Sequence, residues 1–343
     1  MGVKITDPGA LLTIQDGGRQ GYQRYGIAES GACDRESLTL GNLLVGNQPN
    51  TPVLEATLIG PVLEFTSDML IALTGADMEP RINGRTVDNY CAIRVWAGDV
   101  LTFGGLKNGL RTYISFEGGL RGDNDLKSAS TDLRAGLGGI SGRALRAGDM
   151  IETGNSMSQE ISSSPRQIDP PTEYTGSYEI RVVLGPEDEK FTKEALKRFF
   201  EDEYTVSDEY DRMGIRLRGP FIEHIGKADI ISNGIPKGAI QVADNGQPII
   251  MLADRQTVGG YTKLGCVASV DLPLIAQARA GDRIRFKEIN VYDAQKLIAE
   301  RSRRWKAIAK DISSGDTAHK QNLACRYRVL IDGREFDVEV SKV

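Results

Sequence analysis

Histidine is nearly absent from this 343-residue sequence, which contains only His224 and His319. A catalytic triad with a histidine base, or a metal site built from several histidines, needs more of this residue than the chain offers. His224 follows a Gly-Pro turn, where we expect a structural role. We therefore predict chemistry without a histidine base and without a bound metal.

Cysteine is also scarce, and the four cysteines lie far apart without forming a Cys-x-x-Cys pair. This spacing argues against a zinc knuckle or a disulfide framework and indicates a reducing compartment. The N-terminus lacks a basic region followed by an apolar run, and no apolar stretch approaches the length of a membrane span. We expect a cytoplasmic protein with no membrane partner.

The charge distribution and the glycine motifs argue against two further classes. The net charge is −5 and the basic residues are dispersed, so we predict no nucleic-acid partner. The sequence has no Gly-x4-Gly-Lys-Ser/Thr phosphate loop. Residues 136–142 superficially resemble a dinucleotide loop, but residues 143–148 are too few for the helix that such a loop requires. We expect a glycine-rich surface loop there.

The chain does contain a succession of short apolar runs separated by turn residues, mostly Gly, Asn, Asp and Pro. This pattern predicts a mainly β protein, with barrels or sandwiches rather than alternating strands and helices. The polar, proline-containing residues 156–177 are the expected linker between a β domain at 1–155 and a second at 178–288. Residues 289–343 are expected to form a helix and a tail. The predicted helices are residues 35–45 with Asp34 as cap, 190–201, 271–280 and 292–310.

A weak repeat connects the two halves of the chain. The tripeptide Ala-Gly-Asp occurs before a strand-like run at residues 97–99, 147–149 and 280–282. Each occurrence alone is ordinary turn chemistry. The order of Asp-Arg, Gly-Pro and Ala-Gly-Asp is the same in both halves, although the spacings differ, which favours two related β domains.

Residues 247–263 put four polar residues directly after an apolar strand, followed by two glycines and a tyrosine. Polar side chains in such a place are costly unless they meet partners or a ligand. Arg255 offers a planar fork suited to carboxylate, carbonate or phosphate, and Asp254 could orient it or accept a proton. The glycines would permit positive φ or a close approach to a bound group. The alternative is a hairpin in which Asp254 and Arg255 satisfy each other, with its second strand at 266–270.

A similar order of residues occurs near the N-terminus, where Gln15 and Asp16 precede two glycines and Arg19. A tight hairpin would also explain this stretch, because Asp-Gly is a strong turn signal. Asp34 and Arg212 each belong to an Asp-Arg pair beside a turn, where a helix cap or a local ion pair would explain them. The similarity between residues 15–19 and residues 254–260 suggests a site that draws on both halves of the chain.

The motifs that carry a family resemblance are Gln15-Asp16-Gly17-Gly18-Arg19, Ser30-Gly31-Ala32-Cys33-Asp34, Leu54-Glu55 with Gly60-Pro61, Asp211-Arg212-Met213-Gly214, Gly238-Ala239-Ile240-Gln241-Val242 and residues 252–261. Together they resemble the biotin-dependent carboxyltransferase family. That family includes the C subunit of 5-oxoprolinase, the Kip-inhibitor antagonist proteins, proteins labelled allophanate hydrolase subunit 2, and the matching half of the carboxyltransferase domain of urea carboxylase. The resemblance covers residues 1–288 and implies two cyclophilin-like β-barrel domains.

The resemblance also implies a function. It points to a protein similar to the C subunit of 5-oxoprolinase, which acts with a cognate, B-like subunit of similar fold and with a hydrolase subunit. The complex would open a small amide, 5-oxoproline, to glutamate with ATP hydrolysis, and ATP would act through the complex. One alternative is half of a carboxyltransferase for urea or a similar amide, with biotin carried on another protein. The other alternative is a non-enzymatic regulator that binds a kinase-inhibitor protein.

The site residues follow from the same resemblance. We expect Asp254, Arg255 and Tyr261 to be catalytic. In this hypothesis Arg255 and Arg212 hold an anion, while Tyr261 and Gln241 donate hydrogen bonds to developing charge. The residues expected to bind substrate are Gln15, Asp16, Arg19, Asp34, Arg212, Gln241, Gln256, Thr257, Gly259 and Gly260.

The sequence departs from the family pattern at two places. Val258 stands where a second threonine is expected after Thr257. Residues 327–340 resemble the opening hairpin of a biotinyl carrier domain, but the chain ends before an Ala-Met-Lys-Met acceptor, so we expect no biotin on it. An additional hairpin or a tail is the alternative interpretation of this segment.

Overall fold

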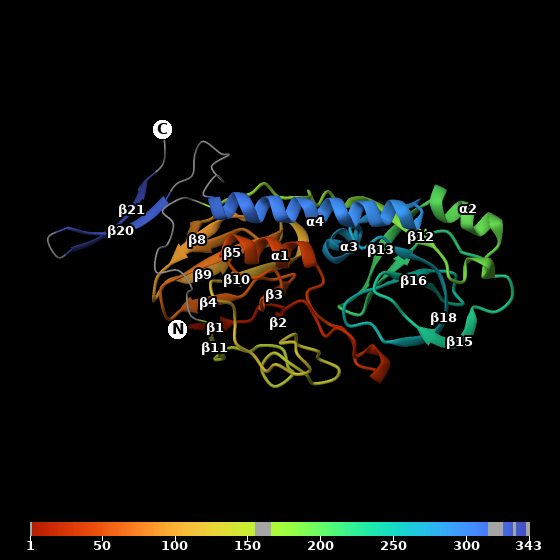
Figure 1. The fold of residues 1–343 in the computed structure, drawn as a ribbon, viewed down its shortest axis with the longest axis horizontal. Coiled ribbons are helices and arrows are strands. Elements are labelled where there is room, and N and C mark those ends of the chain that lie inside the picture. Colours follow the sequence, from red (N-terminus) through yellow and green to blue (C-terminus); the bar gives the residue numbers. More distant parts are fainter. Residues whose placement is uncertain (1, 155–165, 315–324, 332–333, 341–343) are drawn as a thin grey trace.

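The computed structural model describes residues 2–154, 166–314, 325–331 and 334–340. These residues form two β domains that lie side by side, a long helix that runs along both of them, and a separate two-stranded hairpin (Figure 1). The mainly β fold expected from the short apolar runs is therefore confirmed. No helix in these ranges is both long and apolar enough to cross a membrane.

The strands of the first domain form two sheets. The larger sheet has the order β11 (Met150–Glu152), β1 (Gly2–Asp7), β4 (Val62–Phe65), β9 (Val100–Phe103), β6 (Pro80–Ile82) and β7 (Arg85–Thr86). The smaller has the order β2 (Leu11–Gln15), β3 (Val53–Thr57), β10 (Asn108–Phe116), β5 (Met69–Asp77) and β8 (Ala92–Val95). Apolar side chains from both sheets, among them Val3, Leu54 and Ile114, share one buried core, as two packed β layers require.

One helix, α1 (Arg35–Leu44), packs against β5 and β10 of the first domain. The structure confirms Asp34 as its cap, because Asp34 Oδ1 accepts a hydrogen bond of 3.0 Å from Ser37 N. This bond satisfies one of the N–H groups that the first turn of a helix leaves without an intrahelical partner.

The second domain is a closed barrel within residues 177–288. Its strands follow the order β12 (Ser177–Leu184), β19 (Arg283–Glu288), β13 (Glu203–Tyr210), β14 (Gly214–Arg218), β17 (Pro248–Met251), β16 (Ala239–Val242) and β18 (Val258–Val267). The barrel closes where β18 pairs with β12, so Val182 lies opposite Val267. A further strand, β15 (Asp229–Gly234), extends β18 outside the barrel. Two helices accompany the barrel, α2 (Lys193–Glu201) and α3 (Leu272–Gln277), and a 3-10 turn lies at Asp188–Lys190. A second 3-10 turn, Gln23–Tyr25, belongs to the first domain.

The three Ala-Gly-Asp tripeptides form the same turn, and each precedes a strand. The glycine has φ of 88° at Gly98, 93° at Gly148 and 90° at Gly281, values that favour glycine. In each turn the aspartate Oδ2 accepts from the backbone N–H three residues earlier, at 3.0, 2.8 and 3.0 Å. The repeat is therefore a real structural repeat, present in both domains.

The helix α4 (Val291–Ser314) runs along both domains (Figure 1) and is longer than the predicted 292–310. Near its middle, Arg301 Nη1 donates to Ser269 O in the second domain at 2.9 Å. Near its end, Ile312 packs against Leu44 and Leu70 of the first domain. The helix thus connects the two domains by contacts with each.

Two predicted segments remain. Of the predicted linker, residues 166–177 are described, and Ile168 N donates to Tyr90 O in the first domain at 3.0 Å. Residues 156–165 lie outside the described residues. The domain boundaries therefore stay a prediction. At the C-terminus, β20 (Cys325–Ile331) and β21 (Arg334–Val340) pair antiparallel, which confirms the expected hairpin.

Candidate functional site

Residues 254–257 connect β17 to β18, but the two strands do not form a hairpin. β16 lies between them in the barrel and pairs with both. The second strand also begins at Val258, earlier than the predicted 266–270, so Gly259 and Gly260 lie inside a strand. The hairpin interpretation is therefore wrong, and the loop crosses the end of the barrel beside the first domain.

Asp254 does not pair with its neighbour Arg255 but with Arg212. Arg212 Nε donates to Asp254 Oδ2 at 2.8 Å, and Arg212 Nη2 donates to Asp254 Oδ1 at 3.1 Å. Both side chains are buried. This bidentate geometry is the strongest form of an arginine–carboxylate pair.

Arg212 also reaches across to the first domain, where all its remaining donors find acceptors. Nη1 donates to Glu55 Oε1 and to Cys33 Sγ, and Nη2 donates to Gly31 O at 2.7 Å. Together with the bonds to Asp254, these contacts occupy the five N–H groups of the guanidinium. Arg212 therefore joins the two domains and has no free donor for a substrate anion in this arrangement.

Glu55 is the first-domain carboxylate of this network and is fully buried. Burial alone would raise its pKa, but the cations Arg212 and Arg111 and hydrogen bonds from Cys33 N and Tyr113 Oη hold the pKa of Glu55 below its ordinary value. Glu55 is therefore ionised and stabilises Arg212 as a cation. The sequence motif Leu54-Glu55 was noted without a role for its carboxylate; the signal was a charged residue inside an otherwise apolar strand.

Arg255 is held differently and keeps donors free. Its Nε donates to Ile235 O at 3.0 Å and its Nη1 to Leu252 O at 3.2 Å. Nη2 has a looser ion pair, 3.7 Å from Glu29 Oε2. Burial lowers the pKa of Arg255, a sign that this cation is held away from water. Of the two predicted anion-binding arginines, Arg255 is thus the one that can still accept a ligand.

Two glutamine amides lie around Gly259. A Cβ on Gly259 would lie 2.6 Å from Ile235 Cδ1, and 3.0 and 3.2 Å from the amide nitrogens of Gln256 and Gln241. Close packing, rather than a positive φ, is therefore the reason for glycine here. Gln241 is buried and donates to Tyr261 O at 3.4 Å, whereas Gln256 is exposed. Both amides therefore lie against Gly259, and their part in substrate binding stays a prediction.

The remaining predicted residues of this loop lie nearby on the surface of β18. Thr257 O accepts from Ile235 N at 3.0 Å, which fixes the loop against the segment before β16. The Tyr261 side chain is 39% exposed and Val258 is 57% exposed. A Cβ on Gly260 would stay 3.4 Å from the nearest atom, Ile230 O. Tyr261 therefore presents its ring to solvent, where a ligand or partner can reach it.

The N-terminal turn is built around Asp16, which accepts four hydrogen bonds. Oδ1 accepts from Gly18 N at 2.8 Å and from the hydroxyls of Ser128 and Ser130, and Oδ2 accepts from Ala129 N at 2.7 Å. A carboxylate with this many donors is fully occupied. The structure therefore gives Asp16 the task of holding the turn to residues 128–130.

Gln15 and Arg19 are buried beside this turn. Gln15 Nε2 donates to Thr13 Oγ1 at 3.0 Å and to Thr131 O at 3.1 Å. Arg19 donates to Ser130 O and, from Nε, to Asp125 O at 3.3 Å. Burial lowers the pKa of Arg19. Both side chains thus support the loop that follows β10.

Replacing Asp16 with alanine is expected to lower the free energy of unfolding by about 3 kcal/mol, because three buried donors and a half-buried one lose their acceptor. Asp7→Ala is the matched control: Asp7 also forms an Asp-x-Gly turn, with Gly9 N donating to Oδ1 at 2.9 Å, but it is exposed. We expect the control to lose about 1 kcal/mol or less. Urea unfolding measures both, and equal losses would contradict the role given to Asp16.

Residues 29–32 connect the N-terminal turn to the loop at 254–257. Arg19 N donates to Glu29 O at 2.7 Å and Ala32 N donates to Asp16 O at 3.0 Å. On the other side, Ser30 N donates to Ala253 O at 3.1 Å. Main-chain bonds therefore join the two motifs through one short segment; a site that draws on both halves of the chain stays a prediction.

Asp34 lies at the same interface between the two domains. Besides capping α1, its Oδ2 accepts from Gln277 Nε2 at 2.9 Å. Gln277, at the end of α3, also accepts from Leu110 N and Arg111 N at 2.9 and 2.8 Å. Asp34 thus takes part in a second connection between the domains. Gln277 was missed in the sequence, where it has no motif around it.

Lys237 is a further residue of the interface that the sequence motifs did not indicate. It lies between β15 and β16, and its Nζ donates to Ala32 O at 3.2 Å. Burial lowers the pKa of Lys237, and no carboxylate lies within ion-pair distance of it among the described residues. Lys237 therefore forms a further connection from the second domain to the first.

The comparisons with known proteins agree with this architecture. The family described as "Carboxyltransferase domain, subdomain A and B" matches residues 25–288. The chain belongs to this family. The family assignment made from the motifs is therefore confirmed, and α4 lies beyond the matched residues.

Similar proteins fall into two groups by name. The chain is 37% identical to the C subunit of 5-oxoprolinase from Haemophilus influenzae, over 86% of this chain and 94% of that protein. It is 34% identical to the C subunit of 5-oxoprolinase from Escherichia coli, over 90% of this chain and 97% of that protein. The urea carboxylase structure from Kluyveromyces lactis matches 92% of this chain with a TM-score of 0.80 and 29% identity, but only 29% of its own length.

The carboxyltransferase family thus includes relatives of very different length. The chain spans nearly the whole of the two 5-oxoprolinase subunits, and 55% of another similar solved chain, that of TTHA0988. In the described ranges no three His, Cys, Asp or Glu side chains are grouped so that they could hold a metal ion.

Proposed function

We propose that this chain is the C subunit of a 5-oxoprolinase, and that the assembled enzyme opens 5-oxoproline to glutamate with hydrolysis of ATP. The observation that supports this most is the similarity to two C subunits of 5-oxoprolinase. Those from Haemophilus influenzae and Escherichia coli are 37% and 34% identical to this chain and match over 94% and 97% of their own length. A urea amidolyase from Saccharomyces cerevisiae is 30% identical.

The geometry of the site suits this substrate. 5-Oxoproline is a cyclic amide with a carboxylate, and Arg255 offers a buried cation with a loosely paired Nη2 for that carboxylate. The amides of Gln256 and Gln241 and the exposed Tyr261 would donate hydrogen bonds to charge that develops on the amide oxygen. Asp254 accepts two bonds from Arg212, so it would position the loop rather than take a proton.

The relatives named as C subunits of 5-oxoprolinase support a multi-subunit complex. We infer that the chain works with a cognate, B-like subunit of similar fold and with a hydrolase subunit. ATP would bind and be cleaved within the complex, and no step of its hydrolysis is assigned to residues of this chain. Unpaired Cys33, Cys91 and Cys266 support a cytoplasmic location.

Reconstitution tests the proposal. The chain is co-expressed with the two partner subunits from its own genome, and glutamate formation from 5-oxoproline is measured with and without ATP. We expect turnover that requires both ATP and this chain. Equal turnover by the partner subunits alone would contradict the proposal.

A carboxyltransferase that acts on urea is the second candidate, favoured by the match of 92% of this chain to the Kluyveromyces lactis structure. It requires biotin on a separate carrier protein. Carboxylation of urea by the same preparation, supplied with bicarbonate, ATP and a biotinylated carrier, distinguishes it. We expect no such activity, and a rate above that with 5-oxoproline would favour this candidate.

A further inference from the structure

Glu29 is the carboxylate that faces Arg255, and it was not predicted as a site residue. Its Oε2 lies 3.7 Å from Arg255 Nη2, and no other carboxylate lies within ion-pair distance of Arg255 among the described residues. This separation is longer than a direct N–H···O hydrogen bond, which spans about 2.7–3.2 Å. Glu29 thus balances the charge of Arg255 without engaging Nη2 in a tight bond.

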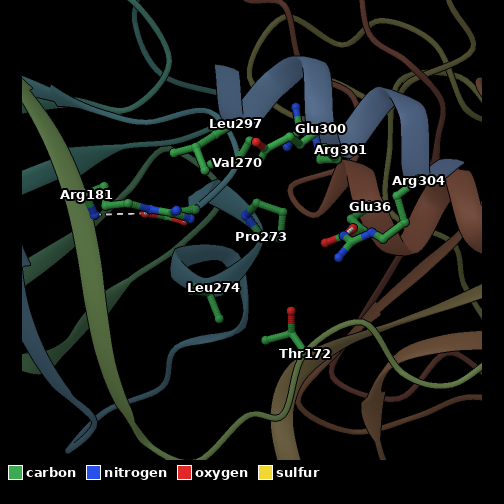
Figure 2. Close-up of a pocket in the computed structure, with 11 residues that line it drawn as sticks. Glu36, Thr172, Arg181, Val270, Pro273, Leu274, Leu297, Glu300, Arg301 and Arg304 are labelled. Atoms are coloured by element: carbon green, nitrogen blue, oxygen red, sulfur yellow. Dashed lines mark hydrogen bonds and ion pairs between the residues drawn. The ribbon is translucent and has the colours of Figure 1, made fainter. Parts of the chain in front are cut away.

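Other arginine–carboxylate pairs at the junction of the domains are bonded directly. In the cavity beneath α4, Arg181 Nε donates to Asp271 Oδ2 at 2.9 Å, and Arg304 Nη2 donates to Glu36 Oε1 (Figure 2). The donors of these arginines are taken up by their own carboxylates. The looser pair of Arg255 is therefore the one that an incoming anion can open with the loss of less bonding.

The Glu29 side chain is the more accessible member of its pair. It is 15% exposed, whereas the Arg255 side chain is 6% exposed. Oε1 of Glu29 accepts from Nε2 of Gln20, which is exposed. Gly18 leaves room for the side chain, because a Cβ there would lie 3.2 Å from Glu29 Cγ. Glu29 can therefore turn toward Gln20 and solvent.

The main chain around Glu29 is fixed, so such a movement involves the side chain alone. Arg19 N donates to Glu29 O at 2.7 Å, and Ser30 N donates to Ala253 O at 3.1 Å. These bonds keep the Cα of Glu29 beside the loop at 254–257. Rotation about side-chain bonds is fast compared with the turnover of most enzymes, so it does not limit binding.

A substrate carboxylate at Arg255 would lie next to the carboxylate of Glu29. Two negative charges this close repel each other, and the repulsion is stronger where water is partly excluded. A substrate carboxylate and Glu29 therefore cannot both stay at Nη2 of Arg255. One of them must leave, and Glu29 has the accessible side chain and a second partner in Gln20.

We propose that Glu29 is the resident counter-ion of Arg255, that the substrate carboxylate replaces it there, and that Glu29 thereby sets the affinity of the site for carboxylates. This inference rests on the proposed function, in which Arg255 receives the carboxylate of 5-oxoproline. Glu29 is a positioning residue that acts through Arg255. The exchange keeps the cation paired before and after binding, and a neutral ligand cannot take over that charge balance.

Acetate binding to the full chain tests the exchange without the reaction. The Nε–H group of Arg255, which donates to Ile235 O, is observed by NMR with isotope-labelled arginine and identified by its absence in R255K. We expect a saturable shift with acetate at constant ionic strength, and a Kd at least fivefold lower in Glu29→Gln. Equal Kd values in E29Q and the unsubstituted chain, or no saturable shift in either, would overturn the proposal.

Glu64→Gln is the matched control. Glu64 also has a loose ion pair, 3.5 Å from Lys4 Nζ, on the larger sheet of the first domain. The variant removes the same charge from the chain, and we expect its acetate affinity to equal that of the unsubstituted protein. An equal gain in E64Q would reveal a general charge effect and contradict the role of Glu29. Partial unfolding of E29Q cannot produce the expected result, which is a gain in affinity.

The reconstituted complex provides a second measurement. We expect E29Q to lower KM for 5-oxoproline at least fivefold and to raise kcat/KM. In the R255Q background the same substitution should leave KM unchanged, because Glu29 acts through Arg255. An equal fall of KM in both backgrounds, or none in either, would overturn the proposal. Tighter acetate binding by E29Q in a complex that does not turn over 5-oxoproline would refute the proposed function and support the exchange at Arg255.

Discussion

Replacing Arg212 with methionine is expected to lower the free energy of unfolding by about 3–5 kcal/mol, since two buried carboxylates then lose their shared cation. Arg212 donates five hydrogen bonds, to Asp254, Glu55, Gly31 and Cys33. Removing one partner of a buried charge network leaves the other charges desolvated without compensation. Denaturant unfolding at pH 7 measures the loss.

Arg216→Met is the matched control for this change. Arg216 lies on the adjacent β14 and pairs with Glu209 at 3.1 Å, with the two side chains 50% and 66% exposed. An exposed ion pair contributes about 1 kcal/mol or less. If R212M lost no more stability than R216M, the buried network would not connect the domains as described.

The effect of R212M is also expected to depend on pH. In the unsubstituted protein the folded-state pKa of Glu55 is lowered, so ionised Glu55 contributes stability above the unfolded pKa of about 4.3. That contribution is lost as the pH falls through the folded pKa. In R212M the pKa of Glu55 rises, because its carboxylate has lost the Arg212 cation. Protonation of Glu55 then removes the uncompensated buried charge from the variant. The stability difference between the two proteins should therefore be largest near neutral pH and shrink toward pH 4.

Arg255→Gln is expected to reduce kcat/KM of the reconstituted complex about 100-fold or more, the usual effect of losing one preorganised donor at a reaction site. Arg255 combines burial with an Nη2 that only a 3.7 Å ion pair to Glu29 engages. Glutamine keeps hydrogen-bonding capacity but not the charge. Arg255→Lys keeps the charge without the planar fork, and we expect an intermediate rate.

The control for Arg255 is Arg218→Gln. Arg218 pairs with Asp208 on the exposed face of β14, with the two side chains 67% and 77% exposed. We expect this variant to keep full activity. Thermal unfolding of each variant separates a catalytic loss from a loss of folding, because Arg255 also donates to Ile235 O and Leu252 O. Full activity of the R255Q complex would show that Arg255 does not bind the substrate.

Signals carried by adjacent residues predicted the local structure well. Asp34 caps α1 as expected, because the cap bond joins residues only three apart. The three Ala-Gly-Asp turns form as their sequence indicates, since a left-handed glycine and an aspartate three residues from its donor are encoded in a few positions. Short apolar runs likewise predicted the mainly β fold.

The partners of Arg212 could not be predicted in the same way. A cap or a local ion pair would explain the Asp211-Arg212 motif from its sequence, but Asp211 Oδ1 accepts from Met213 N and Gly214 N. The carboxylates that Arg212 contacts lie 42 and 157 positions away in the chain. Spacing along a sequence does not indicate such contacts, which depend on how two domains pack.

The start of β18 was predicted too late in the sequence for a similar reason, because of the glycine pair at 259–260. Glycines usually mark a turn, so the strand was expected to begin at residue 266, yet it begins at Val258. Gly259 is required because Ile235 packs close to it from a different segment. The pattern of α4 likewise predicted a helix, but not that it would contact both domains.

The structure of the assembled complex with 5-oxoproline bound tests the central claim most directly. The claim is that Arg255, together with Gln256 and Gln241, receives the substrate at the junction of the two domains. We expect the substrate carboxylate within hydrogen-bonding distance of Arg255, with the ring amide facing the glutamine side chains. Substrate bound wholly within another subunit, with no atom in contact with residues 254–261, would contradict this account.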